Sequence, residues 1–320
     1  VPDEGRIVFD DMVKGPIAVD VAELDDMILR RTDGMPTYNM AVVVDDHDMG
    51  VTHVVRGDDH VSNTPKQILL YQALGFEVPT FGHVPMICGP DHQKLSKRHG
   101  ARAVIEYEQD GLLPQALVNY LVRLGWSHGD QEIFSLKELV EFFDGNNLNT
   151  SPAAFDPEKL KWLNAYYLRN TPHGELAALV APFLAKLGYD VPVEKIQSLL
   201  PMYVERATDL NALAQFLTIY FKPAAEIEIE EKAMKALNED GRHQLSVLHG
   251  LIAELPEFTA EALDTLLHDY AAKGGLKFKQ VGPPLRSALT GLAGGPSVHD
   301  VMAALGREES LARIARAAQL

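Results

Sequence analysis

One stretch decides the fold: Gly89-Pro90-Asp91-His92-Gln93-Lys94-Leu95-Ser96-Lys97-Arg98-His99-Gly100. It follows a short apolar run from Val84 to Cys88, and three of its residues within five positions are cationic, Lys94, Lys97 and Arg98. Positive charge at this density suits a polyphosphate ligand. Glycine at each end of the stretch lets such a loop move over a ligand and back. We therefore predict a phosphate-binding loop that follows a buried strand.

The loop differs from the Walker A phosphate loop. That motif needs glycine immediately before the lysine and serine or threonine immediately after it, and Gln93 and Leu95 hold those places here. Ser96 adds a neutral hydrogen-bond donor to the three cations. An isolated pattern of this kind is equally typical of a solvated basic turn, so the rest of the chain has to decide between the two interpretations.

Residues 36–105 have the pattern of half a doubly wound sheet. Ala41–Val44 and His53–Val55 are short and β-branched, and each is followed by a polar loop, which is typical of buried parallel strands. Thr64-Pro65 predicts the start of a helix that runs to Gly75, because proline fits the first helical position. The apolar run before the phosphate loop supplies the next strand. Strand, polar loop, helix and strand predict a βαβ unit with its ligands at the carboxyl ends of the strands.

The segments before and after residues 36–105 differ from it in how their apolar residues are spaced. Residues 1–35 contain two short strand patterns, Arg6–Asp10 and Gly15–Ile17. From residue 106 the apolar residues recur at helical spacing, which predicts helices over 112–124, 135–143 and 157–167. Beyond about residue 170 the pattern predicts helical hairpins throughout, one of them capped by Thr259 and ended by Gly274-Gly275.

Composition limits the class of protein. The chain has 45 acidic and 29 basic residues and a net charge of −16, although residues 270–320 reverse this balance with three acids and seven bases. A single cysteine, Cys88, excludes an internal disulfide and fits a reducing compartment, so we expect a cytoplasmic protein. No apolar run approaches the ~18 residues that a membrane span needs, and we expect no membrane partner. The acidic run Glu226–Glu231 is interpreted as solvated surface.

Several long motifs, in order, resemble one family. KLSKR at Lys94–Arg98 resembles the KMSKS signature of class I aminoacyl-tRNA synthetases. Two upstream segments resemble the RRTDG-x-PTYN and RGDDH-x-x-NTP blocks of the glutamyl branch of that class, Arg30–Asn39 and Arg56–Pro65. Later blocks of the same branch match at Asn119–Trp126, Phe155–Asn164 and Val281–Gly291. The chain thus resembles the bacterial glutamyl-tRNA synthetases from about Val1 to Leu320.

The resemblance implies a fold and a reaction. The fold is α/β plus all-α: residues 1–35 end an inserted acceptor-binding domain and 36–105 form the second half of a Rossmann-type nucleotide-binding domain. Residues 106–168 form a helical stem-contact domain, and 169–320 an all-helical anticodon-binding domain. The reaction is the ATP-dependent activation of L-glutamate to glutamyl-adenylate, followed by transfer to the 3′ end of tRNA(Glu). Mg²⁺ would accompany ATP by bridging phosphate oxygens, with no metal site in the protein itself. We expect a monomer.

The resemblance also assigns roles to residues. Lys97 and Lys94 would be catalytic, stabilising charge on ATP's phosphates. The ATP site would comprise Lys94, Ser96, Lys97, Arg98, Asp59, His60, Met86 and Ile87. Tyr38 and Arg56 would line the glutamate pocket, where a guanidinium suits bidentate binding of a carboxylate. Contacts with tRNA would come from Lys159, Lys161, Arg206, Lys277 and Arg286, with Arg206 at the start of a helix.

Simpler interpretations remain for some of these residues. Met86 and Ile87 equally suit plain core packing, and the lysines around Trp162 equally suit a solvated helix face. Asp58, Asp59 and His60 are adjacent in sequence and point in diverging directions, which argues against a metal site.

One family signature is missing from the sequence. Class I enzymes carry a His-x-Gly-His element in the first half of the nucleotide fold, and no such string occurs here. We therefore expect the chain to correspond to the later two-thirds of the enzyme and to be inactive alone. The alternative function is a non-catalytic tRNA-binding module. A glutaminyl-tRNA synthetase is disfavoured because its anticodon-binding part is a β-barrel, and a glutamyl-queuosine-type paralogue because it lacks the helical C-terminal region. Whether tRNA(Gln) is also accepted stays open.

Overall fold

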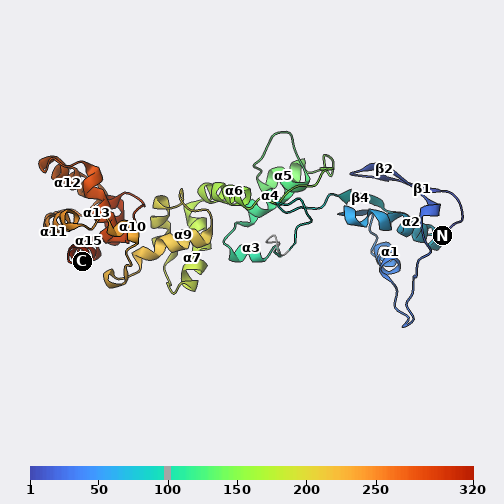
Figure 1. Ribbon diagram of the computed structural model, residues 1–320, viewed down its shortest axis with the longest axis horizontal. Coiled ribbons are helices and arrows are strands. Elements are labelled where there is room, and N and C mark those ends of the chain that lie inside the picture. Colours follow the sequence, from blue (N-terminus) through green and yellow to red (C-terminus); the bar gives the residue numbers. More distant parts are fainter. Residues whose placement is uncertain (97–101) are drawn as a thin grey trace. The chain divides into compact units, whose positions relative to one another are not determined.

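The computed structural model describes residues 1–96 and 102–320 (Figure 1). These residues form two compact units. The first comprises residues 1–109 and 113–163, and the second comprises residues 110–112 and 164–320. The boundary lies within one helix, α6 (Pro157–Asn170). Each unit has its own core, and each is described separately below.

The first unit is organised around a four-stranded sheet with the order β2-β1-β4-β3. The predicted strands at its start are confirmed as the antiparallel pair β1 (Arg6–Asp11) and β2 (Gly15–Asp20). The last residue of β1, Asp11, pairs in parallel with Phe81 of β4 (Thr80–Val84). The hairpin at residues 1–20 therefore belongs to the same sheet as the predicted nucleotide-binding strands.

The predicted βαβ unit is confirmed. Strand β3 (His53–Gly57) leads through the 3₁₀ helix η2 (Asp58–Asn63) into α2 (Thr64–Leu74), and the chain returns as β4 parallel to β3. Pro65 lies in the first turn of α2, and Gly75 ends the helix in the left-handed conformation, as the sequence indicates. Parallel strands carry their carboxyl ends to one edge of the sheet, so this unit positions the candidate site.

The strand before the phosphate loop was predicted at Val84–Cys88, but the structure places it four residues earlier, at Thr80–Val84. The pairing of β4 with β3 ends at Val84 opposite Gly57, because the chain after Gly57 turns into η2 and offers no further partner. Pro85 follows at once and has no N–H to donate to a sheet. Only Cys88 of the apolar run pairs again, in isolated bridges with Lys94 and Ala154.

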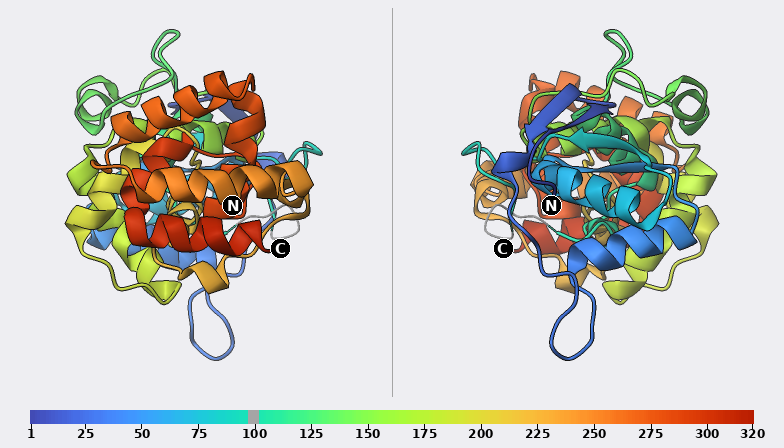
Figure 2. Two further views of the ribbon diagram at one scale, coloured as in Figure 1. Left: turned by 90° about the vertical axis from the view of Figure 1, so that its left-hand side faces the viewer. Right: turned by 90° about the vertical axis from the view of Figure 1, so that its right-hand side faces the viewer.

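The predicted strand at Ala41–Val44 was also wrong. These residues lie in helix α1 (Tyr38–Asp48), and Val43 is fully buried in the core that α2 and the sheet form with Ile68 and Tyr71. Figures 1 and 2 show α1 beside α2. A short run of valines fits a buried strand or a buried helix equally well, and packing against α2 decides between them.

Three further helices of the first unit match their predicted positions: α4 (Pro114–Gly125), α5 (Leu136–Phe142) and the first half of α6. The short helix α3 (Glu106–Gln109) was not predicted as a separate element. Helix α5 begins with a complete capping box, in which the Ser135 hydroxyl accepts from the Glu138 amide at 3.2 Å and the Glu138 carboxylate accepts from the Ser135 amide at 2.7 Å. The helix-period pattern from residue 106 is therefore confirmed.

The second unit is helical throughout its described elements. They are α7 (His173–Lys186), α8 (Val193–Leu199), η4 (Leu200–Met202), α9 (Leu210–Leu217), η5 (Thr218–Tyr220), η6 (Ala224–Glu226), α10 (Glu231–Met234), α11 (Glu239–Ala253), α12 (Ala260–Lys273), α13 (Phe278–Thr290), α14 (Val298–Leu305) and α15 (Arg307–Ala318). Thr259 caps α12 through its side chain, as predicted. In the left view of Figure 2, α11 in orange and α15 in red lie side by side. Arg206 lies in a turn before α9 and does not begin a helix, which corrects the sequence-based expectation.

In the acidic run Glu226–Glu231, glutamate side chains that face solvent alternate with isoleucine side chains that face the core of the second unit. Glu226, Glu228 and Glu230 are exposed, whereas Ile227 is buried and Ile229 packs against the core of the second unit. The extended backbone places successive side chains on opposite faces, and only the carboxylates reach solvent. Within the described ranges, no helix combines the length and apolar character needed to cross a bilayer.

Candidate active site

The candidate site lies at the carboxyl ends of β3 and β4. Arg56 and His83 are direct neighbours in the parallel register, so their side chains share one face of the sheet. The Arg56 guanidinium donates from Nε to His83 Nε2 at 3.2 Å. Its Nη2 donates to Thr64 Oγ1 and to Gln67 Oε1, both at 2.8 Å, and both acceptors lie on α2. Burial lowers the pKa of Arg56 from its usual value.

These bonds limit how Arg56 can meet a ligand. They use the single N–H of Nε and both hydrogens of Nη2, and none of the three acceptors uses Nη1. A carboxylate that approaches through two nitrogens would have to displace Thr64, Gln67 or His83. The bidentate contact expected from the residue type alone is thus restricted, because Nη1 is the only guanidinium nitrogen that these three bonds leave unused.

Tyr38 lies close to Arg56, and the two are within hydrogen-bonding reach. The Tyr38 hydroxyl is 3.3 Å from His60 Nδ1, and the two rings are tilted with centroids 5.8 Å apart. Asn63 Nδ2 lies 3.2 Å from the same nitrogen. The structure therefore brings together two predicted glutamate-site residues and one predicted ATP-site residue.

The predicted ATP residues Lys94 and Asp59 form an ion pair. Lys94 Nζ donates to Asp59 Oδ2 at 3.1 Å, and this interaction lowers the pKa of Asp59. Both side chains are substantially exposed, so the pair can exchange partners when a phosphate arrives. Asp58 makes a separate pair with Lys14 at 3.1 Å.

Gly57 leaves room for the Asp59 carboxylate beside the end of β3. A Cβ at this position would lie 2.7 Å from Asp59 Oδ1 and 3.4 Å from Met86 Sδ. Met86 and Ile87 are half-buried, and the Leu95 amide donates to the Ile87 carbonyl at 2.8 Å. The phosphate loop thus returns to the segments that follow β3 and β4, where it contacts Asp59 and Ile87.

Part of the predicted phosphate loop lies outside the described residues. Lys97 and Arg98 fall in the range 97–101, and their roles remain predictions. Ser96, the last described residue before this range, is half-buried.

The predicted tRNA contacts in the first unit are exposed lysines on α6. Lys159 Nζ lies 3.0 Å from Glu132 Oε1, and Lys161 Nζ lies 3.3 Å from Glu158 Oε1. Exposed pairs of this kind are weak and easily exchanged for a phosphate.

In the second unit, two predicted tRNA residues lie near one another. The positive charge of Arg206 contributes to lowering the pKa of Arg286, after burial as the larger cause. Arg286 Nη2 donates to the Pro296 carbonyl at 3.1 Å, and its buried Nε has no hydrogen-bond partner among the described residues. Lys277 is exposed at the start of α13.

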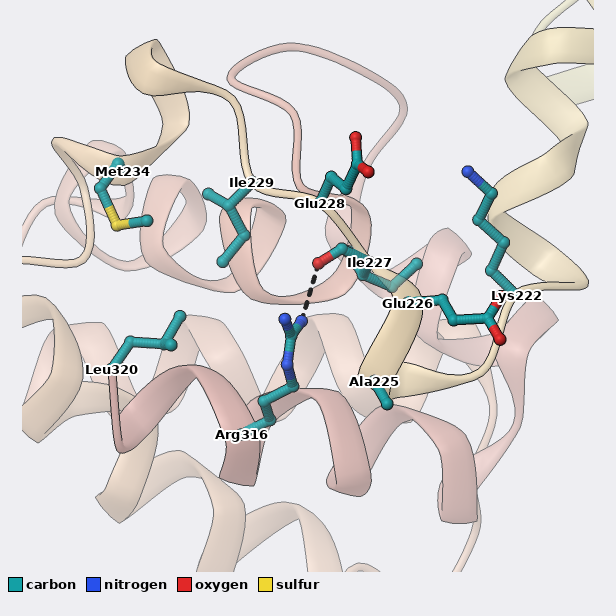
Figure 3. A pocket seen from close by; sticks show the side chains of 9 residues that line it. All are labelled: Lys222, Ala225, Glu226, Ile227, Glu228, Ile229, Met234, Arg316 and Leu320. Carbon is teal, nitrogen blue, oxygen red and sulfur yellow. Dashed lines mark hydrogen bonds between the residues drawn. The ribbon is translucent and has the colours of Figure 1, made fainter.

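A cavity of about 570 Å³ lies in the second unit among η6, α10 and α15 (Figure 3). Arg316 extends toward its wall and donates from Nη1 to the Ile227 carbonyl at 2.8 Å. Glu226 and Glu228 also line the cavity, together with apolar groups such as Met234. Lys222 lines the cavity as well, so two cations face two glutamates and the lining has no excess of positive charge that would favour a phosphate ligand. None of the predicted site residues lines the cavity.

The site's carboxylates do not form a protein metal centre. Within residues 1–96 and 102–320 there is no group of three or more His, Cys, Asp or Glu side chains that could hold an ion. Asp58 and Asp59 are each paired with a different lysine. A Mg²⁺ ion in this site would therefore have to take most of its ligands from ATP phosphates and water.

The sequence did not indicate the following four residues as part of the site, although each contacts Arg56 or another of the four: Asp11, His83, Thr64 and Gln67. The available signal was a histidine in a strand between apolar residues, at Phe81-Gly82-His83-Val84. His83 is fully buried, and a buried polar side chain requires partners.

Comparison with known proteins identifies the family. The family model described as "tRNA synthetases class I (E and Q), catalytic domain" matches residues 1–162, and the "Anticodon binding domain" model matches residues 175–318. Glutamate–tRNA ligase from Nitratidesulfovibrio vulgaris Hildenborough is 62% identical over 320 residues, which cover all of this chain and 69% of that protein. The chain belongs to the glutamate–tRNA ligase family. It aligns with a C-terminal portion of this relative.

Other relatives agree with this assignment. Glutamate–tRNA ligase from Bordetella avium is 48% identical over 313 residues, covering 98% of this chain and 67% of that protein. The crystal structure of a glutamate–tRNA ligase from Elizabethkingia meningosepticum, in complex with its amino acid, superposes with a TM-score of 0.89 at 32% identity. That match covers 99% of this chain and 67% of the other. The predicted class I fold with a helical anticodon-binding part is thereby confirmed.

Proposed function

We propose that this chain acts in glutamate–tRNA ligation: ATP-dependent activation of glutamate and transfer of the glutamyl group to the 3′ end of tRNA(Glu). The observation that carries the proposal is the convergence of Arg56, Tyr38, Asp59 and Lys94 at the carboxyl ends of the parallel strands β3 and β4, in a chain whose relatives are glutamate–tRNA ligases.

Glutamate binding is assigned to Arg56 and Tyr38. Nη1 of the oriented guanidinium would donate to a substrate carboxylate, and the Tyr38 hydroxyl lies close enough to contribute a second hydrogen bond. Because the guanidinium is half-buried, its interaction with a carboxylate is less screened by water than an exposed pair would be.

ATP binding is assigned to the strand end and the loop that follows. Lys94 would exchange Asp59 for phosphate oxygens. His60 follows Asp59 in η2, Ser96 lies two residues after Lys94, and Met86 and Ile87 lie on the segment to which Leu95 is hydrogen-bonded. Lys97 would stabilise the charge that develops on the phosphates as the glutamate carboxylate attacks the α-phosphorus, and Arg98 would hold the outer phosphates. Mg²⁺, when bound with ATP, would neutralise phosphate charge.

Binding of tRNA is assigned to Lys159 and Lys161 in the first unit and to Arg206, Lys277 and Arg286 in the second. Arg286 is half-buried and the other four cations are exposed. Cations at the surface of an acidic protein attract phosphates locally and give salt-sensitive binding. We further propose a cytoplasmic monomer, divided functionally at the boundaries predicted from the sequence.

The proposal is tested by aminoacylation in the full-length enzyme, with labelled glutamate, ATP and either tRNA(Glu) or tRNA(Gln). We expect labelled glutamate to be attached to tRNA(Glu), and the reaction with tRNA(Gln) measures whether that tRNA is also accepted. Arg56→Lys should raise the KM for glutamate about tenfold or more, because a point donor replaces a planar fork. If no glutamate is transferred, the proposed function is contradicted. If Arg56→Lys leaves the KM for glutamate unchanged, the assignment of Arg56 to the glutamate site is contradicted.

A further inference from the structure

A buried, hydrogen-bonded pair of side chains, Asp11 and His83, adjoins the candidate glutamate site. Asp11 at the end of β1 and His83 on β4 are 72 positions apart in the sequence, and both side chains are fully buried. Asp11 Oδ2 faces His83 Nδ1. Its other oxygen, Oδ1, accepts from the backbone amides of Val13, Lys14 and His83 at 3.0, 2.9 and 3.1 Å.

These contacts fix the charge of Asp11. Burial by itself raises its pKa, but hydrogen bonds from the Lys14 amide, the His83 side chain and further backbone amides together lower it below the usual value. Asp11 is therefore a carboxylate at neutral pH and can only accept hydrogen bonds. The proton between the two side chains must belong to His83 Nδ1.

The other nitrogen of His83 is fixed from the opposite side. Arg56 Nε lies 3.2 Å from His83 Nε2, and a guanidinium has no acceptor. Nε2 must therefore be the unprotonated nitrogen, and it also accepts from Thr64 Oγ1 at 3.0 Å. Asp11 and Arg56 thus select the same tautomer of a neutral histidine.

The same network fixes the plane of the guanidinium. His83 holds Nε, and Thr64 and Gln67 hold Nη2. Gln67 is itself oriented by donation from Nε2 to Asn39 Oδ1 at 3.0 Å. The guanidinium carbon also lies 5.5 Å from the centre of the Phe81 ring. Rotation of Arg56 would break hydrogen bonds on two of its three nitrogens.

We propose that Asp11 and His83 are positioning residues for glutamate binding, which set the orientation of Arg56 through the His83 tautomer. This rests on the proposed role of Arg56 in the glutamate site. The chain of interactions places a carboxylate behind a histidine that orients a substrate-binding group, an arrangement that elsewhere fixes ring orientation and tautomer. It also explains why the β1–β2 hairpin is joined to the sheet at Asp11.

Asp11→Asn is the most direct test because it is isosteric. In the variant, the three backbone amides around Oδ1 require the amide oxygen of the new side chain. Its NH₂ group must then face His83 Nδ1 and donate to it, which moves the histidine proton to Nε2. Nε2–H would then point at Arg56 Nε–H, so two donors would face each other and the hydrogen bond between His83 and Arg56 would be lost. We expect the KM for glutamate in aminoacylation to rise about tenfold or more, with the KM for ATP within about twofold of the parent.

Two substitutions of His83 separate positioning from packing. His83→Gln can keep an acceptor toward Arg56, whereas His83→Asn can keep only the donor toward Asp11. Both remove a buried ring and should lower the melting temperature similarly. We expect His83→Asn to raise the glutamate KM about tenfold and His83→Gln to raise it less than about threefold. In the Asp11→Asn, His83→Gln double variant the effect of Asp11→Asn should largely vanish, because glutamine has no tautomer to switch.

Arg56→Lys, measured alongside, distinguishes the two proposals. If it raises the glutamate KM while Asp11→Asn and His83→Asn leave it unchanged, the positioning role is overturned and the glutamate site stands. Equal KM values for His83→Asn and His83→Gln, or an Asp11→Asn effect that persists in the double variant, would also overturn it. An unchanged KM in Arg56→Lys would overturn both.

Discussion

Arg313 provides a quantitative test of how the second unit is held together. Its side chain on α15 is fully buried and donates to the carbonyls of Leu289, Ile219 and Lys222 at 2.7, 2.8 and 2.6 Å. It also pairs with Glu309 at 2.7 Å. One side chain thus joins α15 to the ends of α13 and η5.

Arg313→Met removes the donors and keeps much of the volume. The hydrogen bonds to Leu289 and Ile219 are buried, and an unsatisfied buried carbonyl costs about 1–3 kcal/mol. Two such groups predict a loss of about 2–6 kcal/mol in the free energy of unfolding of the second unit. Glu309 is partly exposed and can be hydrated, so it adds little.

Arg307→Met is the matched control. Arg307, at the start of the same helix, donates to carbonyls at the end of α11, including that of Ala253 at 2.9 Å, and lies over the Phe258 ring. The bonds to Ala253 and Pro256 are exposed and those to Ile252 and Leu255 are only partly buried, so water can replace the donor more readily than around Arg313. We expect a loss of only about 1 kcal/mol, mostly from the cation–π contact.

Urea unfolding distinguishes the two units through different probes. Both tryptophans, Trp126 and Trp162, belong to the first unit, whereas most helical residues belong to the second. Arg313→Met should lower the urea midpoint followed by circular dichroism and leave the tryptophan transition in place. Equal losses in Arg313→Met and Arg307→Met, or a parallel shift of the tryptophan transition, would refute the reasoning.

Three further predictions follow from the site. Gly57→Ala places a Cβ 2.7 Å from Asp59 Oδ1 and should raise the KM for ATP with little change in melting temperature, so an unchanged KM would argue against Asp59 in the ATP site. Because the folded-state pKa of Asp11 is lowered, its contribution to stability is present above the unfolded pKa of about 4 and is lost as pH falls below it. The stability gap between Asp11→Asn and the parent, followed by tryptophan fluorescence in urea, should therefore narrow in acid; a constant gap would contradict this. Lys277→Ala should weaken tRNA binding and reduce the slope of log affinity against log salt by about one, whereas Lys232→Ala, outside the predicted tRNA contacts, should leave the slope unchanged.

The sequence by itself determined the family, the βαβ unit and the helical second half. These rest on local signals. Thr64-Pro65 and Gly75 mark the ends of α2, and Ser135 and Thr259 cap their helices through contacts within four residues. Long motifs such as Arg56–Pro65 further restricted the chemistry, because they combine several chemically distinct residues in a fixed order.

The tertiary structure decided features that depend on contacts between residues distant in the sequence. The valines of α1 fit a strand equally well until packing against α2 is known. The sequence indicated Arg56 as a ligand residue, but its usable nitrogen depends on His83, Thr64 and Gln67. Asp11 reaches this network across 72 residues through one pair of neighbouring strands. Buried polar groups need hydrogen-bond partners, and these partners can come from any part of the chain that the fold brings close. Such contacts produce no periodic pattern in the sequence, so they cannot be predicted from it.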